Sequence, residues 1–131
     1  MRVTDLSNNP DLREHTITKH IRDCHINVED NVLKERFSKE RNEKTKLYSK
    51  FENEDVAADS IATALERNIR KIKQWYEEIQ GAGFLKFFVK LEEPIGYGFN
   101  RNNDRLELSN LAIILCRNKN GGFRIKSAYP C

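Results

Sequence analysis

The stretch DVAADSIATALERNIRKIKQWYEEIQ, residues 55–80, decides the fold, because its apolar side chains recur at three- and four-residue steps. This spacing places them on one face and predicts a long amphipathic α-helix. Asn53 or Asp55 can cap the start of the helix, and Gly81 can end it. We expect Trp75, on the apolar face, to lie in the core rather than to act as a base-stacking platform.

After this helix the sequence changes to runs of β-branched, aromatic and alternating residues. The runs are FLKFFVKLEEPIGYGF (84–99), RLELSNLAIILC (105–116) and GGFRIKSAYP (121–130), separated by Gly, Pro and Asn turns. No helical pattern lies between them, so the sheet should be antiparallel. Gly121-Gly122 is typical of a hairpin joining the last two strands. Helices first and strands after predict an α+β domain, with N-terminal helices packed on an antiparallel sheet.

Two shorter amphipathic segments precede the long helix. HTITKHIRDCHI (15–26) has apolar residues at helical spacing. NVEDNVLKERF (27–37) carries acidic residues early and basic residues late, as the helix dipole favours. The apolar positions of the two segments are Ile17, Ile21, Cys24, Val28, Val32, Leu33 and Phe37. The hydrophilic run SKERNEKTK (38–46) is expected to be a solvated helix end or a loop.

The beginning of the chain is polar and is broken by Asn8-Asn9-Pro10. We interpret residues 1–12 as an approach segment and residues 13–131 as the folded domain. The chain has no apolar run of about 18 or more residues, which predicts no stable membrane insertion. The first 15 residues lack the apolar centre of a signal peptide, so any export signal is expected elsewhere, on a larger parent protein.

Charge and cysteine usage narrow the functional classes. The 131 residues include 23 basic and 20 acidic ones, giving a net charge of +3. This excess is smaller than that of most duplex-DNA binders, but it suits a cleft for one polyanionic strand. Cys24, Cys116 and Cys131 form an odd set without a CxxC pair, which favours reduced thiols, although a Cys24–Cys116 pair stays open. No zinc-ligand spacing is visible.

Several side chains suit phosphoryl chemistry without a metal or cofactor. Cleavage of RNA through its own 2′-hydroxyl needs a proton acceptor, a proton donor, and cations around the phosphorane. Histidine, arginine and hydroxyl side chains supply these groups. Three histidines fall within residues 15–25.

Strand alternation predicts which residues of the last strand share a face. Ser127 and Tyr129 should point the same way, together with Phe123 and Ile125, whereas Lys126 should point away. A joint site for the two hydroxyls is therefore expected where the core face opens into a cleft.

Five segments together resemble one family of bacterial toxins. HTITKH resembles the HTIxKH segment of the bacterial RNase A-like toxin domain, and VLKERF is similar to its LLxRL segment. The block SKFENEDVAADSIATALERNIRKIKQWYEE (49–78) matches its central helical pattern. EEPIGYGF resembles its P-(V/I)-G element, and GGFRIKSAYP its closing G-x-x-I-x-TAYP. The matches occur in order and cover residues 13–130.

The resemblance implies a kidney-shaped RNase A-like fold without essential disulfides. It also implies a ribonuclease toxin that forms the C-terminal tip of a contact-dependent growth inhibition protein. Such a toxin would be delivered from the producer's surface as part of a larger protein, would cleave RNA in the target-cell cytoplasm, and would be neutralised by a cognate immunity protein. The implied partners are RNA and that immunity protein, and not DNA.

The resemblance also carries residue roles. His20, the second histidine of HTITKH, takes the catalytic proton-transfer role, and Arg36 corresponds to the phosphate-binding arginine. Ser127 stands where the family usually has threonine, and Tyr129 keeps the family's tyrosine. The segment between His20 and Arg36 is several residues longer than the family pattern. The residues open to a supporting or competing role are His15, Arg22 and His25.

Two other functions stay open from the residues alone. A non-catalytic RNA- or protein-binding module could use the same polar side chains as a satisfied cluster, and the basic excess would then hold RNA uncut. An EndoU-type RNase would instead need two catalytic histidines and a lysine.

Overall fold

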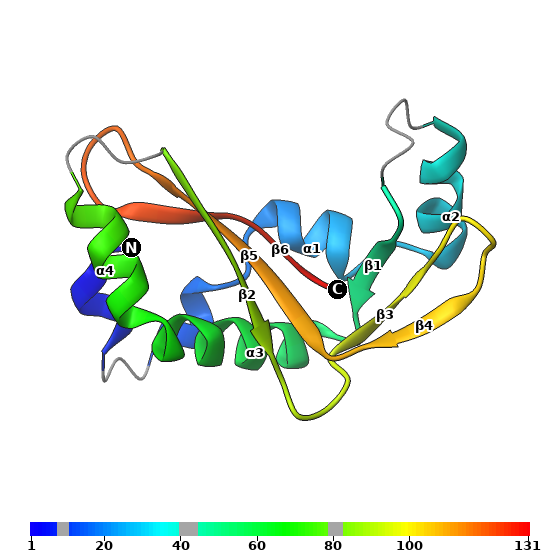
Figure 1. Cartoon of the computed structure of the whole chain (residues 1–131), viewed down its shortest axis with the longest axis horizontal. Helices are drawn as coiled ribbons and strands as arrows, with labels where there is room; N and C mark the ends of the chain where they lie inside the picture. The colour runs from blue at the N-terminus through cyan, green and yellow to red at the C-terminus, as the bar shows by residue number, and fades with distance from the viewer. Residues whose placement is uncertain (8–10, 40–44, 79–82) are drawn as a thin grey trace.

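The computed structural model describes residues 1–7, 11–39, 45–78 and 83–131. Two short 3₁₀ helices come first, Val3–Leu6 and Leu12–His15. The α-helices are α1 (Lys19–His25), α2 (Asp30–Lys39), α3 (Glu54–Arg67) and α4 (Ile69–Glu77). The strands are β1 (Tyr48–Phe51), β2 (Phe84–Lys90), β3 (Gly96–Phe99), β4 (Arg105–Leu108), β5 (Asn110–Arg117) and β6 (Phe123–Pro130) (Figure 1).

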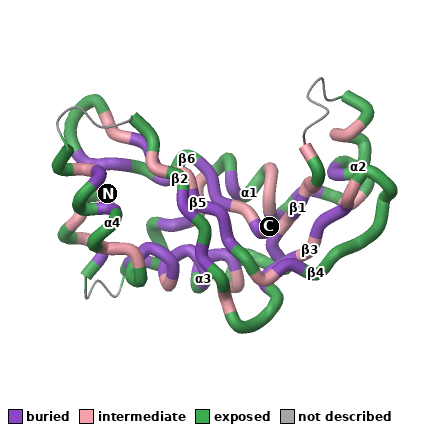
Figure 2. Tube along the Cα trace, in the orientation of Figure 1, coloured by how far each residue is buried: buried purple, intermediate pink, exposed green. Residues whose placement is uncertain are grey.

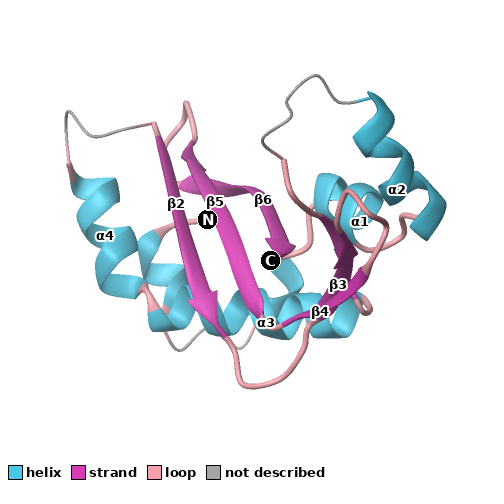
Figure 3. Cartoon of the chain, turned by 45° about the vertical axis from the view of Figure 1, so that its right-hand side comes forward, coloured by secondary structure: helices cyan, strands magenta, loops and turns pink. Residues whose placement is uncertain are grey.

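The strands form two antiparallel sheets with the orders β1-β3-β4 and β2-β5-β6. Only Ser109 separates β4 from β5, so the chain passes directly from one sheet to the other (Figure 3). The sheets also meet where Ser49 Oγ of β1 donates a hydrogen bond of 2.5 Å to the Pro130 carbonyl of β6. The predicted α+β class and antiparallel pairing are confirmed, but β1 was not predicted, and the strands form two sheets where one was expected.

The predicted long helix is two helices, and the prediction of one continuous element is wrong. Asn68 separates them, with φ −117° and ψ 22°. Its side-chain amide donates 2.9 Å to the Ala64 carbonyl, while its backbone N–H bonds to the Leu65 carbonyl instead. An asparagine side chain that takes the i−4 carbonyl competes with the helical ladder and ends the helix. The predicted Asn53 cap is confirmed by its 2.8 Å bond from the Val56 N–H, whereas Gly81 lies outside the described residues.

The main core lies between the helices and one face of the β2-β5-β6 sheet (Figure 2). It includes Ile21, Phe51, Ile61, Leu65, Ile72, Phe87, Leu111, Ile113, Leu115, Phe123, Ile125 and Ala128. Trp75 is 6% exposed, which confirms its predicted place in the core. The N-terminal segment joins this core, because Leu6 is fully buried and the Met1 carbonyl accepts the Phe123 N–H at 2.7 Å.

The start of α1 and the buried positions of α2 differ from the predictions. α1 begins at Lys19, so Ile17 precedes the helix. On α2, Leu33 is fully buried and packs with Val28 and Phe99 in a second, smaller core. Val32 is 44% exposed, so its predicted place on the buried face is wrong. The run after α2 lies partly at residues 40–44, outside the described part of the chain. Among the described residues, no helix is long and apolar enough to cross a membrane.

The hairpin between β5 and β6 turns at the two predicted glycines. Gly121 has φ +97° and Gly122 has φ +77°, a backbone region that favours glycine because it lacks a Cβ. The Gly122 N–H donates 2.7 Å to the Tyr76 hydroxyl, which ties the turn to α4. The predicted hairpin is confirmed.

β6 contains a bulge in its middle. Ser127 pairs with Ile114 of β5, whereas Ile125 pairs with the next residue, Leu115. Lys126 is therefore the extra residue on β6. Because neighbouring residues of β5 point to opposite faces, their partners Ser127 and Ile125 also point to opposite faces.

The bulge reverses the faces predicted for the last strand. Before it, Phe123 and Ile125 point into the core, and after it Ala128 does so, fully buried. Ser127 and Tyr129 point to the outer face of the sheet, away from the core. Their predicted common direction holds, but the prediction that they share a face with Phe123 and Ile125 is wrong.

Candidate active site

The first turn of α1 brings His20 to the last strand. Thr18 caps the helix by accepting the Ile21 N–H at 3.2 Å, and the Ile21 side chain is fully buried in the core. The helix held in this way places His20 Nε2 3.2 Å from Ser127 Oγ. The His20 side chain is exposed, so a ligand can reach its imidazole from solvent. Ser127 is only 8% exposed, and its hydroxyl contacts the imidazole from the protein side.

A second imidazole reaches the same hydroxyl. His25 Nε2 lies 3.5 Å from Ser127 Oγ, and His25 Nδ1 lies 3.4 Å from the Ser49 carbonyl of β1. The His25 ring centroid lies 5.3 Å from that of His20 and 5.5 Å from that of Tyr129. We call His20, His25, Ser127 and Tyr129 the histidine–hydroxyl cluster.

Burial sets the protonation of His25. Desolvation lowers its pKa to about 4, and the charges of His20 and Arg36 act in the same direction. The hydrogen bond to the Ser49 carbonyl raises the pKa but does not offset burial. His25 is therefore neutral at physiological pH.

The neutral His25 defines the direction of the hydrogen bonds in the cluster. The Ser49 carbonyl can only accept, so Nδ1 of His25 carries its hydrogen and Nε2 is an acceptor. The Ser127 hydroxyl then donates to His25 Nε2, and its oxygen accepts the N–H of His20 Nε2. In this arrangement His20 holds a proton on the nitrogen that faces Ser127.

Arg36 approaches the cluster from α2. Its Nη1 and Nη2 atoms each lie 3.4 Å from the Cys24 carbonyl at the end of α1, and its guanidinium carbon lies 5.9 Å from the Tyr48 ring centroid. Its positive charge reaches His25, whose pKa it lowers. The structure thus places Arg36 beside the cluster, as a fixed cation.

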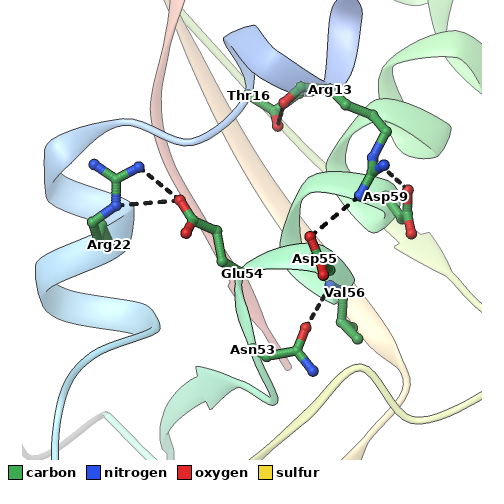
Figure 4. Close-up of polar contacts among 8 residues, drawn as sticks. All are labelled: Arg13, Thr16, Arg22, Asn53, Glu54, Asp55, Val56 and Asp59. Carbon is green, nitrogen blue, oxygen red and sulfur yellow. Dashed lines mark hydrogen bonds and ion pairs between the residues drawn. The ribbon is translucent and has the colours of Figure 1, made fainter.

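Arg22 forms its side-chain contacts with Glu54 of α3 and not with the histidine–hydroxyl cluster. Its Nη2 and Nε atoms donate to Glu54 Oε1 at 2.6 and 3.3 Å (Figure 4). Arg13 forms a neighbouring ion pair of 2.6 Å with Asp59, so exposed salt bridges link the N-terminal helices to α3. The Glu54 carboxylate raises the pKa of Arg22 further. These contacts give Arg22 a structural place rather than one in the cluster.

His15 lies in the second 3₁₀ helix and lines a cavity whose lining residues, among those that the structure describes, include no member of the histidine–hydroxyl cluster. The neighbours in that cavity include Asp5, Thr18 and Arg124. Of the three predicted histidines, the structure brings His20 and His25 together at Ser127.

Two lysines lie near the outer-face aromatic rings, and only one of them, Lys126, had a predicted direction. The prediction that Lys126 faces away from Ser127 and Tyr129 is wrong, because the bulge brings it to the same outer face, with its Nζ 4.2 Å from the ring centroid of Phe84 on β2. Lys86 of β2, which was not predicted as a site residue, has its Nζ 5.9 Å from the Tyr129 ring centroid. Strand alternation in FLKFFVK could have identified Lys86, because it places Lys86 on the same face as Phe84 and Phe88.

The cysteines and metal-ligating residues add no further centre. Cys24, Cys116 and Cys131 are all free, which answers the open question of a Cys24–Cys116 pair. Within the part of the chain that the structure describes, no three or more His, Cys, Asp and Glu side chains are grouped to hold a metal ion.

The arrangement brings together groups that can move protons and stabilise negative charge. An exposed imidazole can exchange protons with a ligand, and a hydroxyl and a neutral imidazole can hold it in one orientation. The Arg36 guanidinium, which uses one N–H of each terminal nitrogen on the Cys24 carbonyl, has further N–H donors for a phosphate.

Comparisons with known proteins agree with the motifs in the sequence. The family described as the bacterial CdiA-CT RNase A domain matches residues 14–130. A crystal structure of a CdiA-CT/CdiI complex from Y. kristensenii 33638 is similar, with a TM-score of 0.73 and 25% identity, covering 86% of this chain and 98% of that one. No curated protein matches. The chain therefore belongs to the bacterial CdiA-CT RNase A domain family, a family of toxin nucleases.

Proposed function

We propose that this chain is a metal-independent ribonuclease toxin that cleaves RNA by attack of the 2′-hydroxyl on the adjacent phosphate. The observation that carries the proposal is the convergence of His20 Nε2 and His25 Nε2 on Ser127 Oγ, at 3.2 and 3.5 Å. Family membership supports the choice of RNA as substrate and favours this reaction over the EndoU-type alternative.

In the proposed reaction the bond from O2′ to phosphorus forms and the bond from phosphorus to O5′ breaks. A base takes the 2′-hydroxyl proton and an acid gives a proton to the leaving O5′, so the products are a 2′,3′-cyclic phosphate and a free 5′-hydroxyl. His20 is exposed and serves as the general acid/base: it takes the 2′-hydroxyl proton as O2′ attacks and returns a proton to O5′ as the bond from phosphorus to O5′ breaks. His25 is a positioning residue, because its neutral ring holds the Ser127 hydroxyl and through it the His20 ring.

The other residues act on the phosphate. The Arg36 guanidinium stabilises the charge that develops on the phosphorane oxygens. Ser127 and Tyr129 share the outer face of β6, so the Tyr129 hydroxyl can donate to the phosphate or orient the 2′-oxygen once substrate is bound, while the Ser127 hydroxyl, which donates to His25, positions the His20 ring. Serine in place of the family's threonine keeps the hydroxyl and loses the methyl that stiffens the side chain.

The proposal extends to the biology of the domain. We expect delivery as part of a larger protein and action on RNA in the target-cell cytoplasm. The similarity to a CdiA-CT/CdiI complex supports a cognate immunity protein as the partner that neutralises the toxin.

The test is cleavage of total RNA in EDTA by the wild type and by matched histidine variants. His20→Ala should lower the cleavage rate by about 100-fold or more, because it removes the general acid/base. His15→Ala, outside the histidine–hydroxyl cluster, should keep wild-type activity. Circular dichroism and the unfolding midpoint show that each variant is folded. Full activity of a folded His20→Ala variant would overturn the assignment, and an inactive wild type would favour a non-catalytic binding module.

A further inference from the structure

β2 exposes two aromatic rings on the outer face of its sheet. Phe84 is 53% exposed and Phe88 is 63% exposed. The alternation of the strand explains the direction, because Phe87 and Val89 are buried in the core while Phe84, Lys86 and Phe88 face solvent. Large exposed rings that gather on one face commonly mark an interaction site.

Lysine side chains lie over these rings. Lys86 Nζ is 5.5 Å from the ring centroid of Phe88 and 5.9 Å from that of Tyr129. Lys126 Nζ is 4.2 Å from the ring centroid of Phe84. Each exposed phenylalanine therefore has a cation within reach of its face. We call Phe84, Lys86, Phe88 and Lys126 the Phe–Lys face.

The Phe–Lys face continues directly from the histidine–hydroxyl cluster. The strand registers place Lys86 level with Ser127, and Phe88 level with Tyr129, with one residue of β5 between the members of each pair. Adjacent strands lie about 4.8 Å apart, so each pair is separated by about 10 Å across the sheet. Phe84 lies four residues from Phe88, about 13 Å along the strand and farther from the cluster.

The charge of this sheet favours a polyanion. β2, β5 and β6 carry basic residues and no acidic one, although the whole chain has 23 basic and 20 acidic residues. The basic residues of the three strands are Lys86, Lys90, Arg117, Arg124 and Lys126. Aromatic rings among cations, without carboxylates, form the surface that binds single-stranded nucleic acid by stacking and charge.

We propose that the Phe–Lys face binds single-stranded RNA beyond the cleavage position, with Phe84 and Phe88 stacking on bases and Lys86 and Lys126 contacting phosphates. The proposal deepens the ribonuclease function proposed above and rests on it for the identity of the ligand. It explains why two phenylalanines stay in water beside the cluster, because their burial occurs only when RNA is bound.

The test measures equilibrium binding of a 2′-O-methyl octanucleotide, which lacks the attacking hydroxyl and stays uncut. 2-Aminopurine in the oligonucleotide reports stacking through loss of its fluorescence. Phe84→Ser/Phe88→Ser should weaken binding by at least about 25-fold and abolish the fluorescence loss, because each of the two stacked bases contributes about 5-fold or more to affinity. Leu106→Ser removes an apolar side chain of 42% exposure from β4, on the other sheet, and should leave both readouts unchanged.

The salt dependence of the same binding tests the lysines. Lys126→Gln should reduce the slope of log affinity against log salt by about 0.7, the value for one phosphate contact on a single strand. An unchanged slope would overturn the assigned role of Lys126. Equal octanucleotide affinity of the wild type and the double phenylalanine variant would overturn the proposal. The proposal would also be overturned if the double phenylalanine variant kept its affinity for RNA but no longer bound the immunity protein, because the face would then be a protein-docking surface.

The outcome separates this proposal from the function proposed above. If the wild type cleaves RNA in EDTA but the phenylalanine variant binds the octanucleotide as tightly as the wild type, only the Phe–Lys face fails. If the variant loses octanucleotide binding and the wild type cuts no RNA, the binding surface stands and the ribonuclease function fails.

Discussion

The stability of this protein should depend on pH through His25. Burial lowers the folded-state pKa of His25 from 6.5 to about 4. As pH falls below 6.5, the unfolded chain takes up a proton at His25 that the folded chain does not accept until about pH 4. The free energy of unfolding therefore falls as pH decreases from 6.5 to about 4, and the contribution of the neutral His25 to stability is complete only above this range.

The size of the effect follows from the two pKa values. A separation of 6.5 and about 4, at about 1.4 kcal/mol for each pH unit, gives an upper limit of about 3 kcal/mol. Carboxylates also titrate in this range, so the wild type alone does not isolate His25. The informative quantity is the difference in unfolding free energy between the wild type and His25→Gln, which lacks this titration.

The assay is urea unfolding of both proteins at several pH values between 7.5 and 4. The wild type should lose up to about 3 kcal/mol more than His25→Gln over this range. His15→Gln keeps His25 and serves as the matched control, with a pH dependence like that of the wild type. The same pH dependence for the wild type and His25→Gln would refute the argument that His25 is buried in its neutral form.

Three further predictions concern the other residues of the site. Ser127→Ala should lower the rate of RNA cleavage by about 10-fold or more, because it removes the hydroxyl between the two imidazoles. Ser127→Thr, which keeps a hydroxyl, should cleave RNA like the wild type. Equal cleavage rates for the wild type and both variants would exclude a role for the hydroxyl. Arg36→Gln should raise the pKa of His25, measured by NMR titration, because the guanidinium charge lowers that pKa; an unchanged value would show that the charge does not reach the ring. Arg22→Gln should leave cleavage within about twofold of the wild type because Arg22 is paired with Glu54, and a larger loss would return Arg22 to the site.

The secondary structure was largely predictable where local chemistry decides it. The alternating runs and Gly121-Gly122 predicted the antiparallel strands and their hairpin, and Asn53 predicted the start of α3. The break at Asn68 was missed, because the apolar spacing continues across it and only the side-chain bond to Ala64 shows that the helix ends.

The faces of the last strand were only partly predictable. Ser127 and Tyr129 share a direction because they lie two residues apart, but the bulge at Lys126 turns both of them away from the core. A bulge depends on the partner strand, so the sequence of β6 alone does not reveal it. The same bulge brings Lys126 over Phe84, on the same face as Ser127 and Tyr129 rather than on the opposite face as predicted.

The histidine assignments show what tertiary structure adds. The motif singled out His20, with His25 and Arg22 as competitors for its role or that of Arg36, and His15 as a supporting or structural residue. Only the packing of α1 against β1 and β6 separates them, because it brings His25 between Ser127 and the Ser49 carbonyl. β1 itself, four residues long, was too short to predict from alternation.

The central claim is that the histidine–hydroxyl cluster cleaves RNA through the 2′-hydroxyl without a metal. The most direct test is to incubate the protein with a short RNA in EDTA and determine the chemical ends of the fragments. The account predicts 2′,3′-cyclic phosphates and 5′-hydroxyls, lost in His20→Ala and kept in His15→Ala. Fragments with 3′-hydroxyl and 5′-phosphate ends, or cleavage that stops when EDTA is added, would contradict it.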